Sequence, residues 1–155
     1  MSDSVRLYVP SDKAACLALF DSNVPRYFDA SERPAFENFL NQPTGEYFVI
    51  EKAGAICGCG GFRKEDRGQA RFTWGMVDNA HHGSGLGRLL AEYRLQAIEA
   101  SGSFVEAELF TTPQIAPFFA KFGFQTVHLE TDGFAQGMDK VQMILRLTGG
   151  DPERS

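Results

Sequence analysis

The sequence has little positive charge, no long hydrophobic run and no recognisable export signal. Fifteen Lys and Arg stand against 20 Asp and Glu, which gives a formal charge of −5, and the basic residues are scattered. Nucleic acid is therefore not an expected partner. No segment has about 20 consecutive apolar residues, and the first 20 residues lack a charged-then-apolar signal region. We expect a cytoplasmic protein that does not associate with membranes.

Potential metal ligands are also scarce. The three cysteines are Cys16, Cys57 and Cys59. The Cys-x-Cys pair lies in a glycine-rich, strand-like stretch with no second pair to complete a zinc site, so we expect buried free thiols. Adjacent His81 and His82 would point apart in a strand or turn, and His128 is the only other histidine. We predict no metal.

Length and composition indicate one domain with a real core, because 43% of the 155 residues are hydrophobic. We expect this domain at 1–148 and a disordered tail at 149–155. Hydrophobic periodicity and turn signals predict its elements. In chain order they are a strand at 5–9, a helix capped by Ser11, a helix from Ser31 to near Asn41, an antiparallel meander of three strands at 46–77, a helix at 86–102, a strand at 104–112, a short helix stopped at Gly123, a loop at 130–139 and a strand at 140–147.

One loop carries most of the functional information. The stretch HHGSGLGRLL, residues 81–90, has glycines at three alternate positions directly before a leucine-rich helix. It is not a phosphate loop of the Walker type, because Arg88 and Leu89 stand where Lys and Ser or Thr are needed. It is not a dinucleotide fingerprint either, since it follows an antiparallel meander. Glycines that turn several N–H groups inward, together with a helix N-terminus, can bind phosphate or pyrophosphate.

The span MVDNAHHGSGLGRLL resembles the acetyl-CoA signature of the Gcn5-related N-acetyltransferase (GNAT) family. That signature has a Val, then Arg or Gln five residues on, then Gly-x-Gly-x-Gly; Val77 takes the first place and His82 departs from the usual Arg or Gln. FTTPQIAPFFAKFGF is similar to the second signature of the family, which ends in Gly123 and Phe124. The resemblance implies an α/β (α+β) fold: a mixed, mostly antiparallel sheet of about 6–7 strands flanked by about four helices.

The resemblance also implies where acetyl-CoA binds. Backbone amides of the loop would hold the pyrophosphate, and pantetheine would run beside the fourth strand, in a splay between the fourth and fifth strands. No metal is implied. The residues that we expect at the cofactor are Met76, Val77, His82, Gly83, Ser84, Gly85, Leu86, Gly87, Arg88, Thr112, Phe118 and Phe119.

The catalytic acid and base of the family are not in their usual places. Relatives often have a Tyr acid where this chain has Phe119, and Glu or His bases where it has Arg71 and Thr73. Arg and Phe cannot do that work at neutral pH. Glu108, acting through water, is our candidate catalytic residue. The base could instead come from the early helices, where Tyr27, Asp29 and Glu37 are available, or the protein binds acyl-CoA and transfers nothing.

Two functions follow from these observations. The first is an acetyl-CoA-dependent N-acetyltransferase that acts on a primary amine of a small molecule, peptide or protein by direct attack in a ternary complex. For its acceptor we expect Arg71, Thr73 and Tyr27 as binding residues. The second is a non-catalytic acyl-CoA sensor or partner-binding module of the same fold. The sequence names neither the acceptor nor the acyl chain length, and it leaves a homodimer open.

Overall fold

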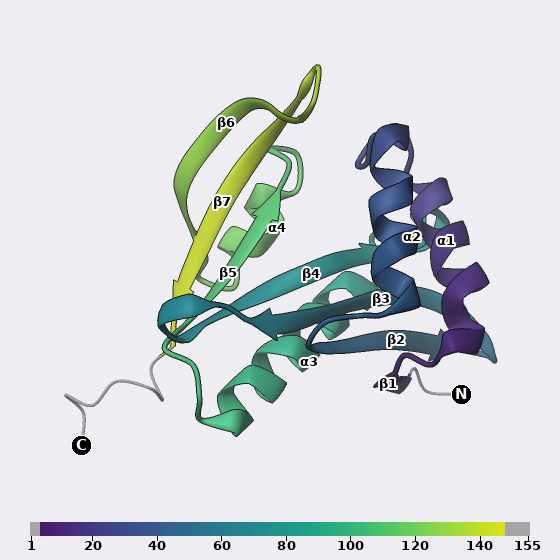
Figure 1. Ribbon diagram of the computed structural model, residues 1–155, viewed down its shortest axis with the longest axis horizontal. Coiled ribbons are helices and arrows are strands. Elements are labelled where there is room, and N and C mark those ends of the chain that lie inside the picture. Colours follow the sequence, from purple (N-terminus) through teal and green to yellow (C-terminus); the bar gives the residue numbers. More distant parts are fainter. Residues whose placement is uncertain (1–3, 148–155) are drawn as a thin grey trace. The chain divides into compact units, whose positions relative to one another are not determined.

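A computed structural model describes residues 4–147, which form seven strands and four α-helices (Figure 1). The strands are β1 (Ser4–Leu7), β2 (Glu46–Lys52), β3 (Ala55–Lys64), β4 (Gln69–Val77), β5 (Glu106–Thr111), β6 (Gln125–Ala135) and β7 (Met138–Arg146). The helices are α1 (Lys13–Ser22), α2 (Arg33–Asn41), α3 (Leu86–Ser101) and α4 (Ala116–Ala120). The tail that we expect at 149–155 lies outside the described residues.

The strands follow the hydrogen-bonding order β1-β2-β3-β4-β5-β7-β6. β4 and β5 pair in parallel, whereas β1 with β2, β2 with β3, β5 with β7 and β6 with β7 pair antiparallel. The mixed, mostly antiparallel sheet and the four helices confirm the predicted fold class. No helix within residues 4–147 combines the length and apolar character needed to cross a membrane.

The chain forms two compact units. The first takes in the described residues up to Arg63 together with Thr73–Arg94, and the second takes in Lys64–Phe72 and the described residues from Leu95 onward. The chain passes from one unit to the other at the end of β3, within β4 and within α3.

The first unit has apolar clusters on both faces of its strands. Side chains alternate between faces along a strand, so Val49 of β2 joins one cluster and Ile50 the other. Val49 packs with residues of α1 and α2, which lie side by side in Figure 1. Ile50 packs with Val77, Leu86 and Leu90. Burial of Leu86 and Leu90 therefore fixes the first turns of α3 to the end of β4.

Two aspartates, not the serines, make the side-chain hydrogen bonds to the backbone at the first two helical segments. We predicted a helix capped by Ser11 and a helix from Ser31, but each serine lies inside a short 3-10 turn, Pro10–Asp12 or Ala30–Glu32, that precedes the α-helix. The Asp12 carboxylate accepts the Val9 N–H at 2.9 Å, and the Asp29 carboxylate accepts the Ser31 N–H at 3.0 Å. The predicted cap at Ser11 was wrong because the first turn begins one residue earlier, after Val9, and Asp12 at its third position bonds back to the Val9 N–H.

The second unit contains a long hairpin, β6–β7, of which only the second strand was predicted. We predicted a loop at 130–139, yet β6 continues through this stretch to Ala135 and turns at Gly137 into β7 (Figure 1). The residues of β6 up to Asp132 are exposed, so no apolar alternation marks this part of the strand. This part of the chain is a strand because its backbone pairs with β7. The register shifts after Thr126 and after Glu130.

Candidate functional site

The loop between β4 and α3 is an exposed turn whose path needs two glycines. β4 ends at Val77, a 3-10 turn follows at Asn79–His81, and α3 begins at Leu86. Gly83 and Gly85 have φ of +86° and +91°, where any other side chain would strain the backbone. A Cβ built on either glycine would meet no atom of the described chain within 4 Å. The space in front of the loop is therefore open.

The start of α3 offers unpaired backbone donors to this space. The Gly85 carbonyl accepts the first helical hydrogen bond, from the Leu89 N–H at 3.0 Å. N–H groups of a first helical turn, here residues 86–88, have no acceptor within the helix. Their partial positive charge favours an anion. Arg88 adds a guanidinium that is 73% exposed and that forms an ion pair with Glu92 at 2.9 Å.

Short local contacts brace the same loop from inside. The Ser84 N–H donates to the His81 carbonyl at 3.2 Å, and the Ser84 hydroxyl donates to the same oxygen. The Ala80 N–H donates to the Asp78 carboxylate at 2.8 Å. Leu86 is only 1% exposed and anchors the helix start. These hydrogen bonds and the buried Leu86 side chain hold the loop in one conformation.

The carbonyl of Val77 connects the loop to β4 and α1. It accepts the Asn23 side-chain amide at 2.9 Å and Nε2 of His82 at 3.0 Å. The His82 ring also lies 5.1 Å from the Tyr27 ring. The first unit therefore brings three of the predicted residues together, Val77, His82 and Tyr27, whereas the Met76 side chain packs in the cluster with Val49. Asn23 was missed, because a buried asparagine whose partner is 54 residues away has no local signature.

Two of the predicted residues carry orphaned hydroxyl groups. Thr73, in the first unit, and Thr112, in the second, are 5% and 6% exposed. Neither Oγ1 atom has a hydrogen-bond partner among the described residues. Most buried polar atoms are hydrogen-bonded, and an exception calls for an explanation such as a ligand.

In the second unit, Arg71 and the buried Glu108 form a part-buried ion pair. Nε of Arg71 lies 2.7 Å from Oε1 of Glu108, and the Gln142 amide donates to Oε2 at 2.7 Å. The Glu108 side chain is 3% exposed, and that of Arg71 is 29% exposed. A carboxylate has about four lone-pair sites, so Glu108 keeps acceptor capacity beyond these two bonds. The two residues are also the last register pair of the β4–β5 ladder.

Phe118 and Phe119 belong to an aromatic cluster of the second unit. The Phe119 ring lies 5.0 Å from Phe118, 5.8 Å from Phe124 and 6.2 Å from Phe72, each in an edge-on arrangement. Such contacts are typical of core packing. The ring at the expected tyrosine position therefore packs within this cluster, and it has no proton to donate.

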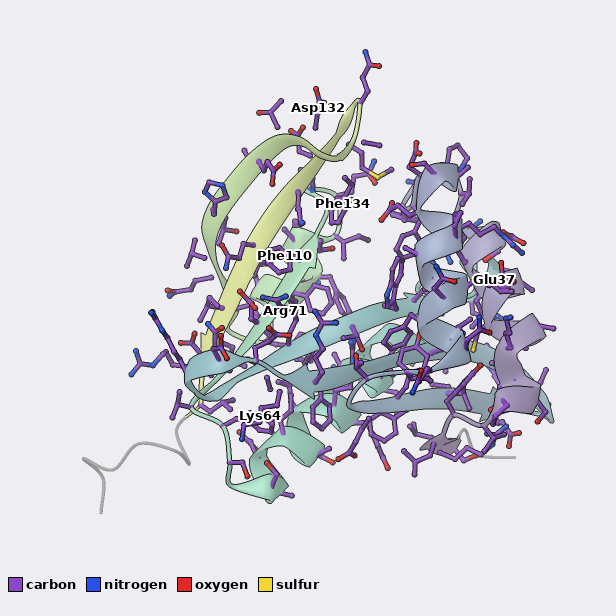
Figure 2. The ribbon with its side chains drawn as sticks, in the orientation of Figure 1. Glu37, Lys64, Arg71, Phe110, Asp132 and Phe134 are labelled. Carbon is purple, nitrogen blue, oxygen red and sulfur yellow. The ribbon has the colours of Figure 1, made fainter. Side chains whose placement is uncertain are left out.

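The alternative bases of the early helices already have partners. Asp29 accepts hydrogen bonds from the hydroxyl and N–H of Ser31, which lower the pKa of its carboxyl. The Glu37 carboxylate lies 3.4 Å from the Lys13 ammonium. Figure 2 shows Glu37 on α2, in the first unit. Asp29 and Glu37 are thus engaged in local structure.

The cysteines are buried and free, as predicted. Hydrogen bonding with Cys59 and burial raise the pKa of the Cys16 thiol, so it is a poor nucleophile. Within the described residues no group of three or more His, Cys, Asp or Glu side chains is arranged to hold a metal ion.

Residues 43–126, more than half of the chain, match the family model described as an acetyltransferase (GNAT) domain. This segment contains β4, the glycine loop, α3, β5 and α4. No curated protein matches the chain.

Solved acetyltransferase structures have the same fold. A ribosomal-protein alanine N-acetyltransferase from Escherichia coli is 16% identical, with a TM-score of 0.78 over 94% of this chain and 94% of that one. An N-acetyltransferase from Staphylococcus aureus is 17% identical, with a TM-score of 0.74 over 94% and 99%. The yncA protein of Salmonella typhimurium, solved with its cofactor acetyl-CoA, is 20% identical, with a TM-score of 0.71 over 95% of each chain.

Proposed function

Since the chain belongs to the GNAT acetyltransferase family, we propose that it transfers an acetyl group from acetyl-CoA to a primary amine of a small molecule, peptide or protein. The observation that carries the proposal is the open glycine loop at the start of α3. Positive φ angles at Gly83 and Gly85 and empty space around them leave the loop backbone accessible. Such a backbone fits a pyrophosphate without a metal.

In this proposal the first unit binds the cofactor chiefly through its backbone. N–H groups between His82 and Arg88 hold the pyrophosphate, and the Arg88 guanidinium adds charge. The backbone of Met76 and Val77 hydrogen-bonds the pantetheine arm, which lies along β4 as an added strand would. Because the Val77 carbonyl already accepts two hydrogen bonds, its N–H is the backbone group that we propose for the ligand. Thr73 and Tyr27 are proposed for the acceptor.

Acetyl-CoA supplies a thioester carbonyl that a neutral amine attacks directly in a ternary complex. For the second unit we propose Thr112, Phe118 and Phe119 as cofactor-binding residues. Glu108 is proposed as the general base, which accepts the proton of the amine through a water molecule. Because Phe119 has no hydroxyl, protonation of the leaving thiolate would fall to solvent.

One observation favours a second function, an acyl-CoA sensor or partner-binding module that transfers nothing. The aromatic cluster around Phe119 provides no acid, and both oxygens of Glu108 accept hydrogen bonds from protein groups. Such a module would keep the cofactor loop and lack turnover.

The two functions are separated by measuring binding and turnover on the same preparation. Calorimetry gives the affinity for acetyl-CoA, and release of the free CoA thiol is followed against a panel of amines. Amine-dependent release supports the transferase. Tight binding without release for any amine supports the sensor. Absence of acetyl-CoA binding would overturn both.

A further inference from the structure

Cations and aromatic rings alternate along the strands of the second unit. Cζ of Arg71 lies 5.1 Å from the centroid of the Phe110 ring. Nζ of Lys140 lies 4.8 Å from the same centroid and 5.6 Å from that of Phe134. Figure 2 shows Arg71, Phe110 and Phe134 one after another, toward the turn of the β6–β7 hairpin near Asp132. We call Arg71, Phe110, Lys140 and Phe134 the cation–ring row.

The charge of Arg71 is compensated within the protein. Its Nε lies 2.7 Å from Glu108, and one of its terminal nitrogens lies 3.9 Å from Glu65. The buried Glu108 carboxylate, held also by Gln142, fixes the guanidinium where it covers Phe110. Arg71 therefore contributes a fixed guanidinium with N–H donors to the row, and little net charge.

The charge of Lys140 is not compensated. Among the described residues no carboxylate lies within ion-pair distance of its ammonium, although Glu130 stands opposite it in the β6–β7 register. The nearby aspartates have other partners: Asp132 accepts the Gly137 N–H at 2.7 Å, and Asp139 accepts the Asp132 N–H at 2.9 Å. A half-buried ammonium against two rings has lost part of its hydration. The Lys140 ammonium is therefore suited to bind an anion.

We propose that the cation–ring row binds the carboxylate and the hydrocarbon part of the amine acceptor, so that the acceptor is an amino acid with an apolar or aromatic side chain. The inference rests on the proposed function and names its substrate class. Lys140 and the outer nitrogens of Arg71 bind the carboxylate. The half-buried faces of Phe110 and Phe134 cover the hydrocarbon.

The row begins where the strands stop pairing. Arg71 and Glu108 form the last register pair of the parallel β4–β5 ladder, and GNAT proteins are expected to transfer the acetyl group where these two strands separate. An acceptor held by the row would therefore have its carboxylate end bound beside this point. Polyamines are disfavoured, because two cations already contact the Phe110 ring and like charges repel.

The test uses matched acceptors and matched variants of the full chain. The acceptors are L-phenylalanine, L-phenylalaninamide, which lacks the carboxylate charge, and spermidine. The variants are Lys140→Gln and, as a control, Lys64→Gln, which removes the same charge from an exposed position at the end of β3 (Figure 2). Comparing each variant with the wild type on the same acceptor cancels differences in the intrinsic reactivity of the amines.

Lys140→Gln is expected to raise the KM for L-phenylalanine by about tenfold or more, with kcat changed by less than about twofold. The KM for L-phenylalaninamide and the affinity for acetyl-CoA should not change, and Lys64→Gln should match the wild type throughout. The proposal is overturned if spermidine is the best acceptor. It is also overturned if Lys140→Gln leaves the KM for L-phenylalanine unchanged.

Failure of the proposed function is recognised separately. If no amine releases CoA thiol, binding of N-acetyl-L-phenylalanine and N-acetyl-L-phenylalaninamide is measured by calorimetry in the presence of CoA. If wild type binds N-acetyl-L-phenylalanine more tightly than the amide, and Lys140→Gln binds both equally, the row is an anion site in a protein that is not a transferase. Equal binding of the two compounds, or no binding of either, overturns the row as well.

Discussion

Nε2 of His82 donates a hydrogen bond to the carbonyl oxygen of Val77, 3.0 Å away. A carbonyl oxygen can only accept, so Nε2 carries the proton. The bond ties the glycine loop to the last residue of β4 and so links two sets of backbone donors proposed to bind acetyl-CoA. Relatives often carry Arg or Gln at this position, and both side chains can also donate. His82 thus departs from the family in residue type while keeping a donor.

His82→Ala should weaken acetyl-CoA binding by about tenfold at most, because one hydrogen bond that positions the loop contributes about 1 kcal/mol. Isothermal calorimetry measures the change. His128→Ala is the control, since His128 lies exposed on β6 in the second unit and its loss should leave the affinity unchanged. Complete loss of binding in His82→Ala would mean that the ring itself contacts the ligand.

Gly85→Ala should weaken acetyl-CoA binding by about tenfold or more, because the new methyl group would occupy the open space in front of the loop amides. The positive φ also carries a backbone cost of about 1–2 kcal/mol for any non-glycine residue. Gly54→Ala is a matched control: Gly54 has φ of +82°, a Cβ there would meet nothing within 4 Å in the described chain, and it lies in the β2–β3 turn.

Thermal melts should show a similar loss of stability in the two alanine variants. Calorimetry should show weaker binding only in Gly85→Ala. Equal acetyl-CoA affinity in both variants would show that the loop does not bind the cofactor.

Local pattern was enough to predict the loop and most elements. Alternate glycines before a leucine-rich helix require an open turn and a helix N-terminus, and both are found at Gly83, Gly85 and Leu86. β6 was predicted poorly because its exposed residues show no apolar alternation, and its partner strand, not its own sequence, makes it a strand.

The long-range contacts could not be predicted in the same way. Arg71 and Glu108 are 37 residues apart and meet only because β4 and β5 pair in parallel with one particular register. The same holds for Lys140, whose two ring partners come from β5 and β6. A sequence shows which charges exist, but the register decides which of them are compensated.

Asp12→Asn should lower stability at neutral pH. The Asp12 carboxylate, 4% exposed, accepts two hydrogen bonds from Arg6, at 2.9 and 3.0 Å, and one from the Val9 N–H. The hydrogen bonds from Arg6, above all, lower the pKa of Asp12. Loss of the buried charge partner is expected to cost about 1–3 kcal/mol in the free energy of unfolding.

The same pair predicts the direction of the pH dependence. A folded-state pKa below the unfolded value, about 3.9 for Asp, means that the carboxylate stabilises fully above that value. Its contribution then disappears as the pH falls through the folded-state pKa. Urea unfolding at neutral and acidic pH should therefore show a difference between wild type and Asp12→Asn that shrinks toward low pH. A constant difference would show that the effect is not electrostatic.

Glu108→Gln tests the proposed general base. If Glu108 accepts the proton of the amine, kcat should fall by about a hundredfold or more, and the acidic limb of the pH profile of kcat/KM should disappear. Affinity for acetyl-CoA should be unaffected, because the pyrophosphate loop does not involve this carboxylate. Glu106→Gln is the control: Glu106 lies two residues earlier on β5 and accepts a hydrogen bond from Gln69, so its replacement should leave kcat and the pH profile intact.

Glu108 also holds Arg71 in place, so a structural effect must be separated from a catalytic one. Thermal melts report whether Glu108→Gln still folds, and Glu108→Asp keeps the charge for Arg71 while it shortens the side chain by one methylene group. Partial recovery of kcat together with the acidic limb in Glu108→Asp supports the base. A folded Glu108→Gln enzyme with unchanged kcat and pH profile would exclude Glu108 and return the search to Tyr27, Asp29 and Glu37. Because Asp29 and Glu37 are already engaged with Ser31 and Lys13, Tyr27, which lies beside the His82 ring, would then be the first of the three to replace.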